Sequence, residues 1–208
     1  MQAMTELDQT AERTDRRQCR RRWSIAAFRR SRDGAAAIEF ALLAIPYFMV
    51  VFAIIETFIA FAGEEFVSNA VYTLGRKTRT GQITATNTDR TAFRTAFCKE
   101  ISILITCSST EAATPSKLFV DVQKFATFAA IPTTIPKKST ANFSDLDTSA
   151  LQYAPGGAGT INMVRAYYKW QVIGDLIRPY ISNVRPSDGS SAYFLIVATA
   201  AFQNEQYP

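Results

Sequence analysis

Histidine is absent from all 208 residues of this chain. The absence excludes the commonest general base of active sites and the commonest metal ligand in proteins. A Ser-His-Asp triad and a histidine-ligated zinc site are therefore ruled out, and no other nucleophile stands in a pattern with a recognisable base. We expect no enzyme, and accordingly no catalytic residue, cofactor-binding residue, metal ligand or small-molecule substrate.

The folded part of the chain has little net charge. The formal charge is +5, but the first 33 residues contain nine arginines against five carboxylates and so supply +4 of it. The remainder is nearly neutral, which gives no reason to expect nucleic acid as a partner. The positive charge instead forms a basic segment at the N-terminus, directly before a long apolar run.

That apolar run extends from Ala35 to Ala62, and Glu39 and Glu56 are its only charged residues. At about 1.5 Å per residue, 28 helical residues suffice to cross a hydrocarbon core of about 30 Å. We therefore predict a transmembrane helix over 35–62. Because cytoplasmic flanks are enriched in arginine, residues 1–34 are expected as a basic cytoplasmic leader, in a single-pass protein of the inner (cytoplasmic) membrane. Residues 63–208 would form a periplasmic or extracellular domain.

The chain has only three cysteines, and this topology separates them. Cys19 lies in the leader, in a reducing compartment, and is expected to be an unpaired thiol. Cys98 and Cys107 lie on the oxidising side, nine positions apart, and we predict a disulfide between them.

The exported segment is predicted to be α+β. Apolar residues at helical spacing continue from Glu64 to Leu74, and Thr88-Asp89 offers an N-cap for a second helix that ends near Cys107, so that 63–107 is helical. Alternation then predicts strands within 117–128, 163–173 and 192–203, which would form a small antiparallel sheet of about three strands. The Thr-, Ser-, Pro- and Gly-rich segment 131–160 is long for a compact domain and is expected to be functional or mobile.

Glu39 is the most informative residue of the apolar run. A carboxylate near the start of a membrane helix costs a few kcal/mol and needs a partner. Glu56 is less demanding, because it lies toward the outer interface and could reach water.

The surrounding residues resemble a known family. Arg32-Asp33-Gly34, followed by Ala35-Ala36-Ala37-Ile38-Glu39-Phe40-Ala41-Leu42 and then Pro46, is similar to the processing region of the TadE/TadG-like minor pilins, or pseudopilins, of the tight-adherence (Flp, type IVb-like) pilus system. The apolar run Leu195–Phe202 near the end of the chain loosely resembles their closing strand. The short chain is more similar to TadE-type than to TadG-type members.

The resemblance implies a processing site and a set of partners. A membrane prepilin peptidase would cut after Gly34, so that Ala35 becomes the new N-terminus and Glu39 the glutamate needed for processing or assembly. The implied partners are this peptidase, other pilins and the proteins of the pilus assembly platform. The expected function is that of a minor pilin that takes part in pilus assembly and packs through its N-terminal helix.

Two alternatives remain open. Ala60-Phe61-Ala62 before Gly63 fits the cleavage pattern of a secretory signal peptide, although the apolar run is about twice the usual 7 to 15 residues. The chain could also be an uncleaved single-pass anchor whose outer domain binds an envelope partner, with Glu39 facing another membrane helix. The first residue of the mature chain separates these hypotheses.

Overall fold

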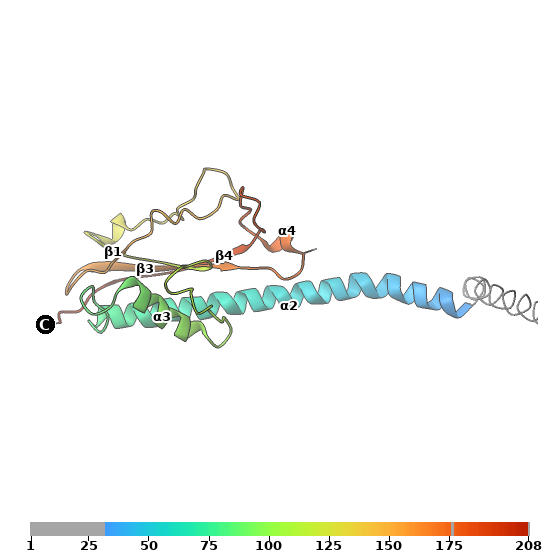
Figure 1. Ribbon diagram of the computed structural model, residues 1–208, viewed down its shortest axis with the longest axis horizontal. Helices are drawn as coiled ribbons and strands as arrows, with labels where there is room; N and C mark the ends of the chain where they lie inside the picture. The colour runs from blue at the N-terminus through green and yellow to red at the C-terminus, as the bar shows by residue number, and fades with distance from the viewer. Residues whose placement is uncertain (1–31, 176, 208) are drawn as a thin grey trace, which may run out of the picture. The chain divides into compact units, whose positions relative to one another are not determined.

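The computed structural model describes residues 32–175 and 177–207, so the predicted leader up to Ser31, with Cys19, lies outside the described residues. The chain divides into two compact units, Met1–Phe52 and Ala53–Pro208. One long helix, α2 (Arg32–Arg79), contributes residues to both units (Figure 1). Residues 53–62, which the sequence assigns to the membrane segment, belong to the second unit.

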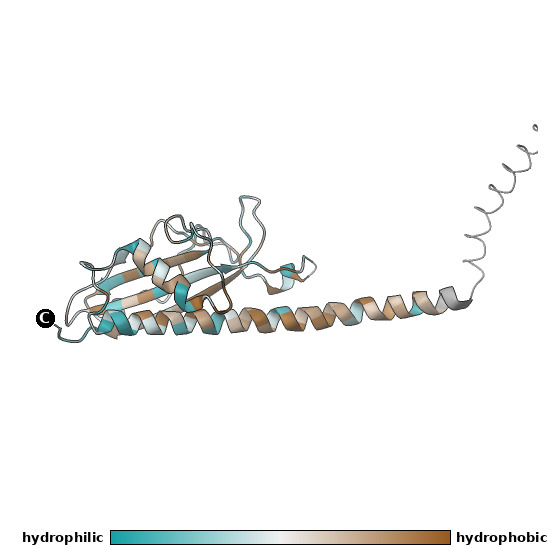
Figure 2. Ribbon diagram, turned by 60° about the horizontal axis from the view of Figure 1, so that its bottom comes forward, coloured by the Kyte–Doolittle hydropathy of each residue, from teal (hydrophilic) through white to brown (hydrophobic). Residues whose placement is uncertain are grey.

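The described part of the first unit is the beginning of α2, and Glu39 is the only charged residue from Ala36 to Phe52. Most of its large apolar side chains from Ile38 to Phe52 are 41–75% exposed, and Figure 2 shows the hydrophobic colouring of this helix. Among the described residues, one helical segment, Ala36–Arg79, is long and apolar enough to cross a membrane. An unpartnered helix of this kind is typical of a membrane span, and it fits a single-pass membrane protein.

The second unit contains a mixed four-stranded sheet, so the prediction of three strands was one strand short. The strands are β1 (Leu118–Phe125), β2 (Tyr153–Ala154), β3 (Ile161–Trp170) and β4 (Phe194–Gln203), in the order β2-β1-β3-β4. β3 pairs with β1 and β4 in antiparallel fashion, whereas β2 runs parallel to β1. β2 has only two residues, too few for an alternating pattern to show in the sequence. Two short helices complete the unit, η1 (Phe128–Ala130) and α4 (Arg178–Ile181).

One face of the sheet packs on α2 and on the second helix, α3 (Arg90–Ile101) (Figure 1). The core between them is built from buried residues of α2, α3 and the three long strands, among them Val67, Leu74, Phe93, Phe97, Leu118, Val164 and Ile196. Two glycines bring α2 close to the strands. A Cβ at Gly63 would lie 2.9 Å from the Trp170 ring, and one at Gly75 would lie 3.0 Å from the Phe202 ring. Larger residues at either position would push the helix away from the sheet.

The predicted cap and disulfide are both present around α3. The Asp89 carboxylate accepts a hydrogen bond from the Ala92 amide at 2.6 Å, as an N-cap residue does. The helix ends at Ile101, six residues before the predicted end near Cys107. Cys98 and Cys107 are joined by a disulfide, with 5.8 Å between their Cα atoms. The bridge therefore ties the last turn of α3 to the loop that follows it.

The other face of the sheet is covered by the long segment 131–160. Arg165 of β3 is buried beneath this segment, and its guanidinium donates to the carbonyls of Pro132 (2.6 Å) and Thr134 (3.3 Å). Leu146 and Leu151 pack with Tyr167 in a second apolar cluster. The segment thus shields from solvent the side chains of β3 that point away from the main core.

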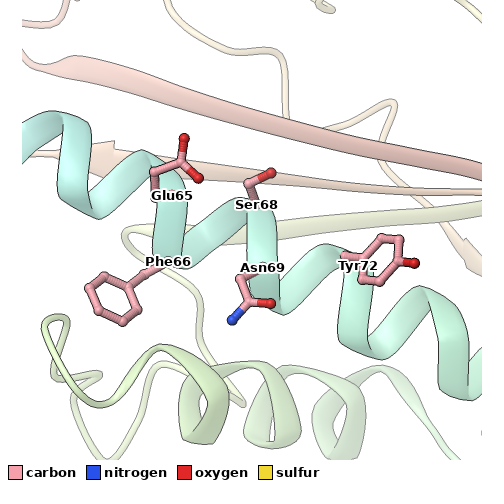
Figure 3. Close-up of a pocket in the computed structure, with 5 residues that line it drawn as sticks. All are labelled: Glu65, Phe66, Ser68, Asn69 and Tyr72. Atoms are coloured by element: carbon pink, nitrogen blue, oxygen red, sulfur yellow. The ribbon is translucent and has the colours of Figure 1, made fainter.

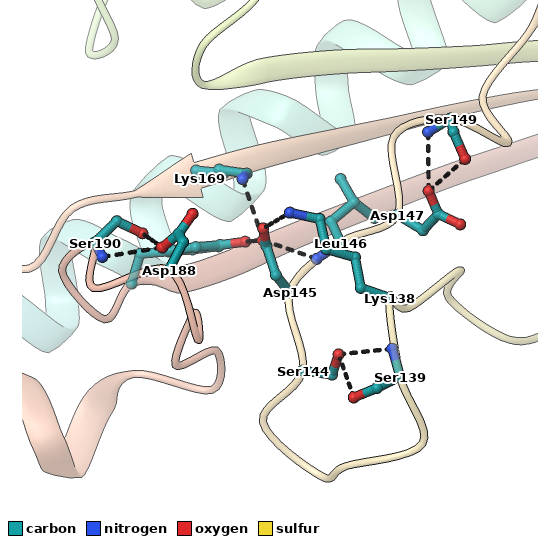
Figure 4. Close-up of polar contacts among 11 residues, drawn as sticks. Lys138, Ser139, Ser144, Asp145, Leu146, Asp147, Ser149, Lys169, Asp188 and Ser190 are labelled. Atoms are coloured by element: carbon teal, nitrogen blue, oxygen red, sulfur yellow. Dashed lines mark hydrogen bonds and ion pairs between the residues drawn. The ribbon is translucent and has the colours of Figure 1, made fainter.

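A buried carboxylate fastens this segment to the sheet (Figure 4). Asp145, whose side chain is 8% exposed, accepts hydrogen bonds from Lys138 Nζ at 2.7 Å, from Lys169 Nζ at 3.2 Å and from the Tyr193 hydroxyl. Burial alone would raise the pKa of Asp145, but the bonds from Lys138, Tyr193 and Lys169 hold it well below its ordinary value near 3.8. The ionised form therefore stabilises the folded state.

We predict that Asp145→Asn lowers the free energy of unfolding near neutral pH by about 3 kcal/mol, because Lys169 and Tyr193 lose the carboxylate between them. A depressed pKa contributes stability that is complete above the unfolded value near 3.8 and is lost as the pH falls through the lower folded value. The cost of the substitution should therefore shrink in strong acid. Urea unfolding of the full chain in detergent micelles at several pH values measures it. Asp147→Asn is the control and should change little, because it removes a half-exposed carboxylate whose hydrogen bonds within the described residues come from its near neighbour Ser149. Equal losses for the two variants would contradict this account of the segment.

Candidate functional site

The predicted processing residues lie at the start of α2. Gly34 and Ala35 belong to its first turn, and Glu39 follows four residues after Ala35, which places positions 35 and 39 on one side of the helix. Glu39 is exposed, and no described residue forms an ion pair with it. The local geometry thus presents a carboxylate one helical turn beyond the Gly34–Ala35 bond.

The surroundings of Glu39 are apolar. Ile38 and Phe40 flank it, and Leu42 and Leu43 follow on the next turn, all of them more than half exposed. In hydrocarbon a carboxylate in this position needs a partner. Glu39 is therefore the one residue of this apolar surface that can form a directional polar contact with a neighbouring molecule.

Glu56, the second carboxylate of the apolar run, has a different environment. It is half-buried in the second unit and accepts hydrogen bonds from the backbone amides of Ile173 and Gly174, the latter at 3.2 Å. These amides belong to the loop between β3 and α4. Besides the partial exposure that leaves Glu56 within reach of water, these two bonds hold the loop against α2.

The contacts of residues 53–63 bear on the signal-peptide alternative. Cleavage before Gly63 would remove Glu56 together with Ala60, which is 4% exposed and forms part of the packed helix face. The loop at Gly174 would lose its neighbour on α2, because Glu56 lies against it. The folded unit thus includes residues 53–62 of the apolar run. We therefore expect no cut at Gly63.

The outer surface of α2 in the second unit carries an open groove. It has a volume of about 500 Å³ and is lined by Glu65, Phe66, Ser68, Asn69 and Tyr72 (Figure 3). Tyr72 is 71% exposed. These side chains contain no nucleophile paired with a base, and in the described part of the chain no three metal-ligating side chains come together. The groove combines polar side chains with the rings of Phe66 and Tyr72.

Sequence reasoning missed three features of this helix, the bond from Glu56 and the close approaches at Gly63 and Gly75. A signal for the glycines was present, because glycine inside a helical pattern costs about 1 kcal/mol and needs a compensating reason. Nothing in the sequence points to the Glu56 contact, since its partners are backbone amides more than a hundred residues away.

One segment of the chain matches a known protein family. Residues 34–76 match the family model described as TadE-like protein. No curated protein and no solved structure matches the chain. The matched segment begins at Gly34 and ends within α2 at Arg76, so it includes Ala35, Glu39 and both packing glycines, and it leaves the sheet outside.

We predict that Glu56→Ala loosens the β3–α4 loop, because hydrogen bonds to a charged acceptor contribute about 2 kcal/mol each. Hydrogen exchange at the amides of Ile173 and Gly174 should accelerate at least about tenfold, while the amides of β3 keep their protection. Glu65→Ala removes an exposed carboxylate from the same helix and serves as the control. Unchanged exchange at both loop amides would show that Glu56 does not hold the loop.

Proposed function

We propose that this chain is a minor pilin of a tight-adherence pilus, processed after Gly34 and packed into the assembly through the N-terminal part of α2. The observation that carries the proposal is the TadE-like match, which begins at Gly34 and runs along this helix. The exposed apolar side chains from Ile38 to Phe52 support it, because a surface of this kind needs lipid or other helices around it.

Processing would divide the chain at a change of environment. Hydrolysis of the Gly34–Ala35 bond by a prepilin peptidase separates the arginine-rich leader from the apolar helix and leaves Ala35 with a free, cationic amine. The leader stays in the cytoplasm under the positive-inside rule, and the second unit lies outside the inner membrane. The Cys98–Cys107 disulfide fits that orientation, because such bridges persist in oxidising compartments.

The new amine gives Glu39 a partner. Within one helix, the amine of Ala35 and the carboxylate of Glu39 share a side, but water competes for both. Between two packed helices, the amine of one subunit and Glu39 of the next neutralise each other in a low dielectric, where their attraction is strong. The pair therefore sets the register of helices whose remaining contacts are apolar.

The second unit is then the part displayed at the fibre. One side of α2 in this unit packs on the sheet. The groove from Glu65 to Tyr72 leaves the outer side of α2 open to a neighbouring helix. In this role the unit caps, primes or decorates the pilus, and no chemical step is required of it.

We predict that Glu39→Gln separates assembly from anchoring. The variant should insert normally, because removal of a charge makes the apolar segment easier to insert. Fibre formation should fail, because the neighbour's amine is left buried without its partner, at a cost of about 3 to 5 kcal/mol. The measurement compares membrane abundance, processing and surface fibres in cells that lack the natural copy.

Glu205→Gln is the matched control, since it makes the same change at an exposed residue that lies outside both the apolar helix segment and the groove. It should leave abundance and fibres unchanged. Normal fibres with normal abundance in Glu39→Gln would remove the assembly role of Glu39 and would favour the uncleaved anchor with an envelope-binding domain.

A further inference from the structure

Arg94 of α3 is a buried cation without a visible partner. The residue is 6% exposed, and its Nε and Nη1 atoms have no hydrogen-bond partner among the described residues. Buried guanidinium groups are usually paired with carboxylates or other oxyanions, because an unpaired charge in a protein interior is costly. The arrangement therefore points to a partner outside the described part of the chain.

Arg94 lines a small cavity beside the edge of the sheet. The cavity has a volume of about 140 Å³, and its polar lining consists of Arg90, Arg94 and Thr148. Phe119, Val120 and Leu151 form apolar walls. A water molecule takes about 30 Å³ of liquid volume, so the space holds several waters or one small organic ion.

The neighbouring charged groups are already engaged. Arg90, one turn before Arg94, donates from Nη2 to the carbonyl of Leu151 at 2.7 Å. The Glu111 carboxylate accepts bonds from the amides of Ser116, Lys117 and Leu118 and from the Ser116 hydroxyl. Burial, followed by the charge of Arg90, lowers the pKa of Arg94, and the charges of Glu111 and Asp89 oppose that shift. The site thus holds two cations close together, while Glu111 is already bonded elsewhere.

We propose that this cavity binds a carboxylate carried on a short aliphatic stem. A guanidinium donates strong charge-assisted hydrogen bonds to carboxylate oxygens, and Arg94 has two buried nitrogens, Nε and Nη1, without a partner. The apolar walls accept the methylene groups of the stem, and the Thr148 hydroxyl can donate to the same oxygens. Such a carboxylate comes from a free small acid or from an aspartate or glutamate side chain of another polypeptide. The site does not depend on the pilus role proposed above.

The test is calorimetric titration of the full chain in detergent micelles with propionate, at constant pH and ionic strength. Propionate should bind saturably to one site, and propionamide, which has the same shape without the charge, should bind at least about tenfold more weakly. Lys99→Met, which removes an exposed cation from the same helix, should bind propionate as the wild type does. Absence of propionate binding, or equal binding of propionamide, would overturn the proposal.

Two variants place the interaction on Arg94. Arg94→Met should abolish propionate binding without lowering the melting temperature, because the guanidinium it removes has two buried nitrogens without a hydrogen-bond partner. Arg94→Lys keeps the charge but loses the planar fork, and it should bind at least about tenfold more weakly than wild type. Undiminished binding in either variant that retains the fold would contradict the assignment.

A pair of peptides distinguishes the two sources of the carboxylate. Both are short and neutral in their remaining residues, and one carries a single glutamate where the other carries glutamine. Tighter binding of the glutamate peptide than of propionate, with no binding of the glutamine peptide, would support a side chain of another polypeptide. Binding of propionate alone would support a free small acid.

Discussion

The close packing of α2 on β3 and β4 is the constraint on which the second unit depends. Gly63 and Gly75 allow the helix backbone to approach the rings of Trp170 and Phe202. The main core consists of side chains from α2, α3 and the three long strands. The same helix contains the exposed apolar residues of the first unit, without an interruption in its helical assignment. A single element therefore serves as both a candidate membrane span and a core helix, and the TadE-like match covers the stretch where the two roles meet.

The two glutamates of this helix show how position decides the role of the same side chain. Glu56 is half-buried and bound to two backbone amides, which is a structural role that the second unit satisfies by itself. Glu39 lies among exposed apolar residues and has no ion-pair partner among the described residues. A carboxylate in that setting requires a cation from elsewhere. The proposed amine of Ala35 in a neighbouring subunit meets the requirement, because processing would give every subunit such an amine at the start of its apolar helix.

Local patterns in the sequence predict the elements whose residues are close together in the chain. The apolar run, the Asp89 cap, the three long strands and the disulfide all follow from spacing, residue type or compartment, and the structure contains each of them. The misses are long-range. β2 has two residues and exists only because β1 accepts it as a neighbour. Segment 131–160 lacks periodicity, yet Asp145 and Arg165 fasten it to the sheet through bonds to distant residues. The cavity at Arg94 likewise depends on residues from α3, β1 and the covering segment, which no local pattern joins.

The central claim is that α2 enters the assembly as a helix that begins at Ala35 and remains continuous with the folded unit. The most direct measurement is the intact mass of the chain, with its N-terminal sequence, after extraction from membranes of cells with an active pilus system. We expect the wild-type chain to begin at Ala35. The Gly34→Leu variant should keep Met1, because a bulky residue then precedes the bond that is cut. Wild-type protein that retains Met1 would contradict processing, and a chain that begins at Gly63 would contradict both processing and the inclusion of Glu56 and Ala60 in the mature fold.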